Sequence, residues 1–129
     1  LLHTEEDIYA WADEFKVEQV VKNYVSNACH HVSGDMVIEV KMVQKDGKVR
    51  VSVFNTGTPI PEADIAHIWD KFYKVDKART REYGGSGIGL SIVEATMKAH
   101  GKDYGVANVE GGVEFYFDVE SADSESVQC

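Results

Sequence analysis

The spacing of apolar positions predicts both helices and strands along this chain. Apolar residues three and four positions apart are typical of amphipathic helices, whereas strict alternation is typical of strands. Helical spacing covers three segments, Glu14 to Val32, Pro61 to Lys71 and Ile88 to His100. Strand patterns cover five segments, Ile8 to Ala12, Val37 to Val43, Val49 to Phe54, Tyr104 to Asn108 and Val113 to Val119.

Residues at the segment ends support these assignments. Asp13 is a predicted N-cap, Gly101 a predicted C-cap, and Asp46-Gly47 predicts a hairpin turn between two strands. Residues 74–86 have no periodicity and are expected to form a loop, which at this length is more often functional than idle. The order of elements predicts a two-layer α/β sandwich, with a mixed five-stranded sheet carrying three helices on one face.

Size and composition limit the possible functions. With 129 residues the chain is expected to form one domain over residues 1–120, followed by a solvated tail over residues 121–129. A formal net charge of −9 argues against a nucleic-acid partner. Two cysteines imply no disulfide framework, and no 18-residue apolar run is present, so we expect a cytoplasmic chain without direct membrane contact.

Glycines recur at alternate positions just before the third helix, in the stretch GGSGIGLSIV that begins at Gly84. Bare glycine backbone lets phosphate oxygens approach the unpaired N–H groups and the positive dipole of a helix N-terminus. The stretch could equally be a flexible connector. No dinucleotide fingerprint precedes it, and the chain has no Gly-Lys-Ser/Thr triplet of a P-loop.

Asparagines mark two further candidate sites. Asn23 and Asn27 are four residues apart and project from one face of the first helix, with His30 and His31 one turn further along. They could be solvent-exposed or cap a neighbouring loop, or an amide oxygen could bind Mg²⁺, which prefers oxygen ligands. Asn55, at the end of a strand, could belong to a simple turn or read the edge of a nucleobase.

Taken in order, these motifs resemble the ATP-binding catalytic domain of bacterial sensor histidine kinases. The resemblance rests on four stretches, N-x-x-x-N-A from Asn23, N-T-G-x-P-I from Asn55, F-Y-K-x-D-K from Phe72 and G-G-S-G-I-G-L-S-I-V from Gly84, and it covers residues 8–119. That family belongs to the superfamily of DNA gyrase and the chaperone ATPases, and its Bergerat-type ATP-binding fold agrees with the expected two-layer sandwich.

The resemblance implies a role for each matching residue. Asn27 would bind Mg²⁺, Asn23 would support the phosphates, and Asn55 would accept a hydrogen bond from the adenine amino group. Gly57 and Ile60 would line the base pocket, and Phe72 would stand at the base of a mobile lid. The triphosphate side would be lined by Gly85, Ser86, Gly87, Gly89 and Leu90.

The sequence also departs from the family pattern. Asn55 stands in place of an aspartate and Pro59 in place of a second glycine. His30 stands where a basic residue often touches phosphate, and His31 where a tyrosine often stacks on adenine. The expected lid is cationic within an acidic chain, and three of its residues are candidates for the γ-phosphate, Lys77, Arg79 and Arg81.

The implied activity is phosphoryl transfer from Mg-ATP to a histidine. Hydrolysing relatives have a glutamate base where this chain has Asn23, whereas an imidazole nucleophile needs no base. None of the five histidines lies in an H-E-x-[RK]-x-P phosphoacceptor motif, so the acceptor is expected on a separate dimerising helical domain. A response regulator receiver domain is the implied partner, and a membrane-bound sensor the implied parent. The alternative is a regulatory module that binds nucleotide with weak or lost kinase activity.

Overall fold

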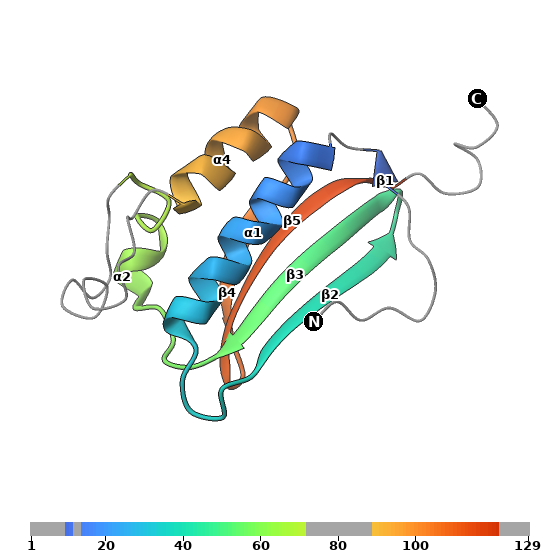
Figure 1. Cartoon of the computed structure of the whole chain (residues 1–129). Coiled ribbons are helices and arrows are strands. Elements are labelled where there is room, and N and C mark those ends of the chain that lie inside the picture. Colours follow the sequence, from blue (N-terminus) through green and yellow to red (C-terminus); the bar gives the residue numbers. More distant parts are fainter. Residues whose placement is uncertain (1–9, 12–13, 72–88, 122–129) are drawn as a thin grey trace.

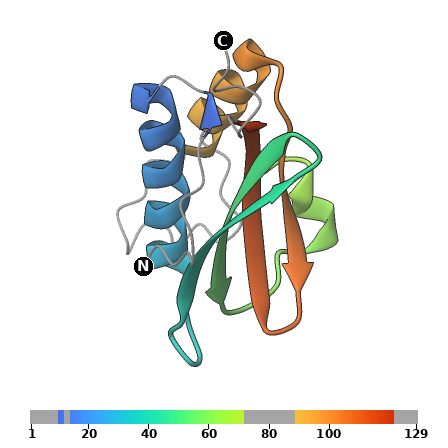
Figure 2. The same ribbon diagram turned by 90° about the vertical axis from the view of Figure 1, so that its right-hand side faces the viewer.

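A sheet and the helices that cover one of its faces make up the two layers of the fold (Figure 1). The computed structural model describes residues 10–11, 14–71 and 89–121. After a quarter turn, α1 lies to the left of the strands (Figure 2). The face of the sheet that points away from α1 and α4 is called the open face below. The predicted two-layer α/β arrangement with helices on one face is confirmed for these residues.

Four long strands and one short strand form the sheet. They are β2 (Ile38–Lys45), β3 (Lys48–Thr56), β4 (Tyr104–Val109), β5 (Gly112–Ser121) and the two-residue β1 (Ala10–Trp11). β5 is central, with β3 and then β2 on one side and both β4 and β1 on the other. Ser121 belongs to β5, so the predicted tail begins one residue later than expected at the earliest.

The prediction of a mixed sheet is wrong, because every pair of described strands is antiparallel. Two of the pairs are hairpins, whose tight turns allow only antiparallel neighbours. The β2–β3 turn is the predicted one, with positive φ at Asp46 (54°) and Gly47 (77°), as a type I′ turn requires. Only two residues of the strand expected over Ile8 to Ala12 are in β1, and Asp13 lies outside the described residues.

Two long helices pack against the sheet, α1 (Glu14–His31) and α4 (Gly89–His100). α4 ends at Gly101 as predicted, with φ of 64° and hydrogen bonds from the N–H groups of Gly101 and Lys102 to the carbonyls of Lys98 and Met97, both 3.1 Å. This is the Schellman pattern, in which a left-handed residue satisfies the last carbonyl groups of the helix.

The helix predicted over Pro61 to Lys71 is much shorter, since α2 covers only Glu62–Ile65. Beyond it the chain closes into three-residue turns, with His67 N–H donating to Asp64 O at 2.9 Å and Asp70 N–H donating to His67 O at 2.9 Å. These turns bring the consecutive residues Ile68 and Trp69 into the core. The chain therefore leaves the helical conformation after Ile65, and the turns allow two adjacent side chains to be buried, which a regular surface helix would not.

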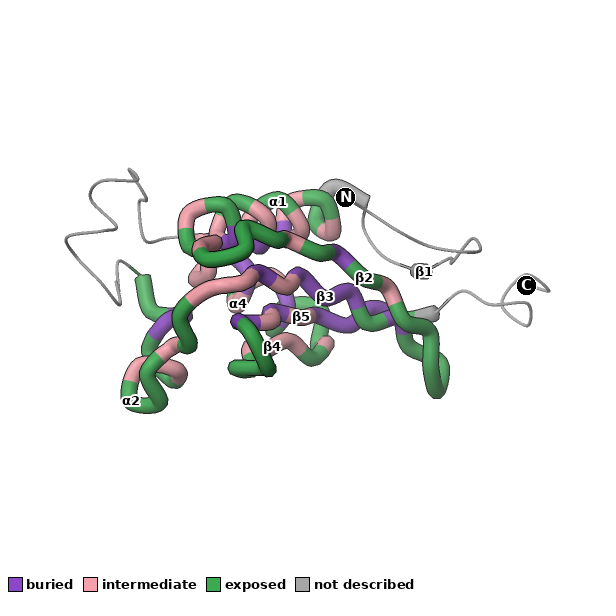
Figure 3. Tube along the Cα trace, turned by 90° about the horizontal axis from the view of Figure 1, so that it is seen from below, coloured by how far each residue is buried: buried purple, intermediate pink, exposed green. Residues whose placement is uncertain are grey.

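The core lies between the helices and alternate residues of the central strands, which appear as buried segments in Figure 3. Val49, Val51 and Val53 of β3 are all buried and share the helix-facing side of that strand. From α1, Tyr24 is fully buried and donates a hydrogen bond of 2.9 Å to the Tyr116 carbonyl of β5. That bond fixes the distance between the helical layer and the centre of the sheet.

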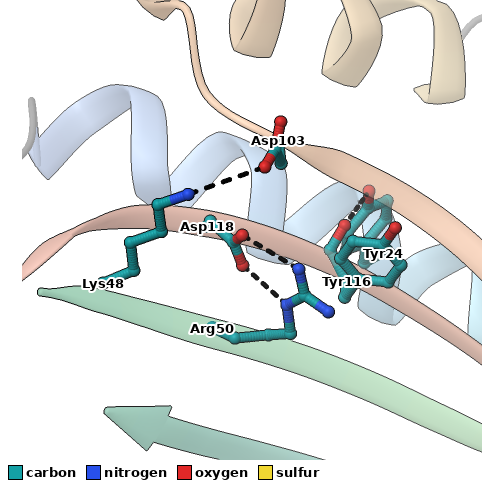
Figure 4. Close-up of polar contacts among 6 residues, drawn as sticks. All are labelled: Tyr24, Lys48, Arg50, Asp103, Tyr116 and Asp118. Carbon is teal, nitrogen blue, oxygen red and sulfur yellow. Dashed lines mark hydrogen bonds and ion pairs between the residues drawn. The ribbon is translucent and has the colours of Figure 1, made fainter. Parts of the chain in front are cut away.

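The open face carries a polar cluster on β3 and β5 (Figure 4). Arg50 donates two hydrogen bonds to the buried Asp118 carboxylate, at 2.7 and 3.0 Å, and its guanidinium lies 4.0 Å from the centre of the Tyr116 ring. The hydrogen bond to Asp118 raises the pKa of Arg50. Lys48 and Asp103 form a looser, exposed pair at 3.8 Å. The cluster satisfies a buried carboxylate on the side of the sheet away from the helices.

Candidate functional site

Asn23 of α1 faces the first residue of α4. A Cβ added to Gly89 would lie 3.5 Å from Asn23 Oδ1 and 3.8 Å from Asn23 Cγ, an ordinary contact distance. Asn23 Nδ2 is buried and, among the described residues, has no hydrogen-bond partner. A buried amide donor without a partner costs free energy, so native proteins rarely keep one without a reason.

The start of α4 adds positive potential at the same place. The first N–H groups of a helix have no partner within the helix, and its aligned peptide dipoles leave about half an elementary charge at the N-terminus. α4 begins at Gly89 and has no acidic residue in its first turn. The side chain of Asn23 and the backbone at Gly89 therefore form one end of a site suited to an anion.

A polar flank runs along α1 from this point. Gln19, Asn23, Asn27 and His30 are all half-buried at spacings of four, four and three residues, whereas the valines at 17, 21 and 25 pack against the core. His31, at the end of the helix, is exposed. The structure therefore confirms that Asn23 and Asn27 share a flank, and it places Asn23 beside the start of α4.

The far end of the site lies where β3 ends. Asn55 is only 3% exposed, and its Nδ2 donates to the Thr56 carbonyl at 3.0 Å, which leaves Oδ1 as the acceptor end of the amide. Gly57 adopts φ of 149°, and a Cβ there would lie 3.0 Å from the His31 carbonyl oxygen and 3.1 Å from Ser33 Oγ. Glycine is thus required by the approach of the α1 terminus, rather than by room for a ligand alone.

Thr56 holds these two segments together, a role that no sequence pattern indicated. Its hydroxyl donates to Ser33 O at 2.8 Å and accepts from Val37 N–H at 3.0 Å, and its carbonyl accepts from Ser33 N–H at 3.0 Å. The end of α1 is therefore held against the end of β3. Asn108, also missed, binds the backbone of the half-buried Ile60.

The segments on both sides of residues 72–88 contact the same tyrosine. Trp69 packs edge-on against the Tyr104 ring at 5.0 Å, and Tyr104 donates a hydrogen bond of 2.8 Å to Glu94 of α4. Burial, with the Glu94 hydrogen bond and charge, raises the pKa of Tyr104 to about 12. β4 therefore fixes the chain before the expected lid and the helix that follows it.

The structure brings the described site residues into one elongated strip. From Asn23 to His31 the strip follows two turns of α1, roughly 12 Å at 1.5 Å per residue. One end combines Asn23 with Gly89, which the half-buried Leu90 follows, and the other combines Asn55 with Gly57. Ile60 lies three residues beyond Gly57, where Asn108 holds its backbone. Seven predicted residues lie outside the described part of the chain, namely Phe72, Lys77, Arg79, Arg81, Gly85, Ser86 and Gly87.

Comparison with known proteins finds relatives that are sensor histidine kinases. The sensor histidine kinase WalK of Bacillus subtilis is 36% identical over 107 residues, which is 81% of this chain and 18% of that protein. The sensor protein kinase WalK of Staphylococcus aureus is 35% identical over 106 residues, which is 81% of this chain and 26% of that protein. The chain thus spans about a fifth to a quarter of the length of these relatives.

Solved structures agree with this relationship. The catalytic domain of the histidine kinase ThkA superposes with a TM-score of 0.77 at 32% identity, covering 92% of this chain and 76% of that one. Full-length ShkA in complex with AMPPNP gives 0.76 at 29% identity, covering 92% and 24%. None of the described helices is both long and apolar enough to cross a membrane.

Residues 12–123 match the family described as histidine kinase-, DNA gyrase B-, and HSP90-like ATPases, and the chain belongs to that family.

Proposed function

We propose that this chain binds Mg-ATP along the strip from Asn23 to Gly57 and transfers the γ-phosphoryl group to a histidine on a separate helical domain. The observation that carries the proposal is the buried Asn23 Nδ2 beside the N-terminus of α4, which no described residue satisfies. A phosphate oxygen would accept from this amide and from the backbone N–H groups together. Relatives that are sensor histidine kinases, and ShkA in complex with AMPPNP, support the same assignment.

The described residues fit each part of this ligand. Asn55 Oδ1 would accept a hydrogen bond from the adenine amino group, because Nδ2 of the same amide is already engaged with Thr56. His31 would stack on the base, and His30 would donate a ring N–H to phosphate. Gly57 and Ile60 would form the wall of the base pocket, with Gly89 and Leu90 on the triphosphate side.

Asn27 would hold Mg²⁺ through its carboxamide oxygen, since this hard ion takes oxygen ligands and is commonly shared with substrate phosphates. When bound, the ion supplies positive charge to the phosphoryl oxygens. The remaining proposed contacts come from residues outside the described part, with Phe72 at the base of the lid, Lys77, Arg79 and Arg81 in the lid, and Gly85, Ser86 and Gly87 before α4.

The chemistry of Asn23 favours a histidine acceptor over water. A carboxamide is not a proton acceptor at neutral pH, so Asn23 orients the phosphates but does not activate a water molecule. A neutral imidazole already has a nitrogen lone pair. The site therefore contributes positioning and charge stabilisation, and the acceptor domain contributes the nucleophile.

The proposal extends to the parent protein. The acceptor histidine would lie on its dimerisation domain, and the phosphoryl group would pass to a response regulator receiver domain in a two-component system. A structure of ThkA in complex with the response regulator TrrA superposes with a TM-score of 0.75 at 32% identity. We place this chain on the cytoplasmic side of a membrane-bound sensor.

Asn27→Ala tests the metal role, because alanine favours the helix and the fold should survive. The variant should lose Mg-ATP-dependent labelling of the phosphoacceptor domain of the same kinase, measured with γ-labelled ATP. Ser26→Ala, an exposed neighbour on the same helix, is the matched control and should label normally. Undiminished labelling by Asn27→Ala would exclude Asn27 as a required ligand. Mg-ATP binding by calorimetry without labelling of the acceptor would favour the regulatory alternative.

A further inference from the structure

The loop that follows Asn55 is held to the β4–β5 hairpin at both of its ends. At the first end, Gly57 N–H donates to the Gly111 carbonyl at 3.3 Å. At the second end, Ile60 N–H donates to Asn108 Oδ1 at 2.8 Å, and Asn108 Nδ2 donates to the Ile60 carbonyl at 2.9 Å. The loop therefore has two anchors, and one of them is a single side chain.

The Asn108 carboxamide is suited to this task. It offers a donor and an acceptor side by side, so it satisfies both backbone groups of one residue at once. Backbone groups in a loop otherwise need water or another partner. Pro59, between the two anchors, has a fixed φ and no N–H, which leaves the loop few alternative conformations. The clamp thus defines where the Ile60 side chain lies.

We propose that Asn108 is a positioning residue for the base end of the nucleotide site, acting through Ile60. This inference rests on the proposed function, in which Ile60 forms part of the wall against the adenine ring. Ile60 is half-buried and packs against the core, so a fixed backbone holds its side chain in one place. The phosphate end, at Asn23 and Gly89, is built from α1 and α4 and does not depend on the clamp.

The role can be separated from a contribution to stability because Asn108 is exposed. Asn108→Ala removes both hydrogen bonds, whereas Asn108→Asp keeps the shape and turns a second oxygen toward the Ile60 carbonyl. Both variants should remain folded. Both should bind Mg-ATP about tenfold more weakly, because a loop held by two hydrogen bonds is released. Val109→Ala, the next residue of β4, is the matched control and should keep the affinity of the unsubstituted chain.

Titration calorimetry with Mg-ATP gives the affinities, and amide NMR spectra at saturation show which end has changed. In Asn108→Ala the nucleotide-induced shifts of Gly57 and Ile60 should differ from those of the unsubstituted chain, while those of Gly89 and Leu90 should be the same. Affinities of both variants equal to that of the unsubstituted chain, or equal changes at both ends of the site, would overturn the inference. If the unsubstituted chain binds no Mg-ATP, it is the proposed function that fails.

Discussion

Replacing Asn23 with alanine should stabilise the free protein while it weakens nucleotide binding. The buried Nδ2 has no partner among the described residues, and an unpaired buried polar group costs about 1–3 kcal/mol. Asparagine also costs up to about 0.7 kcal/mol relative to alanine within a helix. Because Asn23 is only half-buried, its removal leaves little cavity to offset these gains. We expect the free energy of unfolding to rise by about 1–2 kcal/mol.

The same variant should respond less to ligand. A protein at a ligand concentration of 100 Kd gains about 2.7 kcal/mol of stability, and a tenfold loss of affinity reduces this gain to about 1.4 kcal/mol. Urea unfolding with and without Mg-ATP measures both quantities. The unsubstituted chain should be less stable without nucleotide and gain more when it is added.

Gln19→Ala provides a matched control, because Gln19 is half-buried on the same flank one turn earlier. It should change stability by less than about 0.5 kcal/mol and leave the response to Mg-ATP intact. If Asn23→Ala destabilises the free protein, the amide has a structural partner. If it leaves the gain from Mg-ATP unchanged, the amide does not face the phosphates. Either result would exclude Asn23 as an unsatisfied amide held ready for phosphate.

Three further substitutions test the fold around the site. Tyr24→Phe should cost about 1 kcal/mol at pH 7 in urea unfolding, through the lost hydrogen bond to Tyr116. Because burial raises the pKa of Tyr24, the unsubstituted protein should lose about 1.4 kcal/mol between neutral pH and pH 11, so that the order reverses and the variant becomes the more stable by about 0.4 kcal/mol. A difference that does not change with pH would contradict the burial of the Tyr24 hydroxyl. Asp118→Asn should lower the free energy of unfolding by only about 1 kcal/mol, because the half-exposed Arg50 partner is screened by solvent. The Kd for Mg-ATP should not change, because the pair lies on the open face. Gly57→Ala should lower the free energy of unfolding by about 2 kcal/mol or more in thermal melts, because alanine is strained at this φ and its Cβ would press on the His31 carbonyl oxygen. A loss of stability below about 0.5 kcal/mol would contradict this packing.

Local sequence patterns predicted much of the fold. Periodicity placed α1, α4 and the four long strands within a few residues, and the signals at Asp46-Gly47 and Gly101 predicted the turn and the cap that form there. Each of these features depends on residues close together in sequence. The short α2 does not, because the chain after it turns to bury Ile68 and Trp69, and Trp69 packs against the distant rings of Tyr104 and Phe115. The sense of strand pairing also depends on distant partners.

The same limit applies to the site. Asn23 and Asn27 could be recognised because their spacing places them on one helix flank. Asn108 could not, because it binds Ile60, 48 positions away in the chain, and a polar residue near a strand end has no distinctive pattern. Gly57 was predicted as a site residue for the room that it leaves, yet its contacts show that the end of α1 also demands a glycine there. The residues that position the site were therefore less predictable than those proposed to touch the ligand.

A titration of the chain with Mg-ATP, in which amide NMR signals are recorded, tests the proposed nucleotide site most directly. Saturable shifts are expected at Asn23 and Gly89 and at Asn55 and Gly57, with no change at Arg50 on the open face of the sheet. Unmoved signals at Asn23 and Gly89 in millimolar nucleotide would contradict the proposed site.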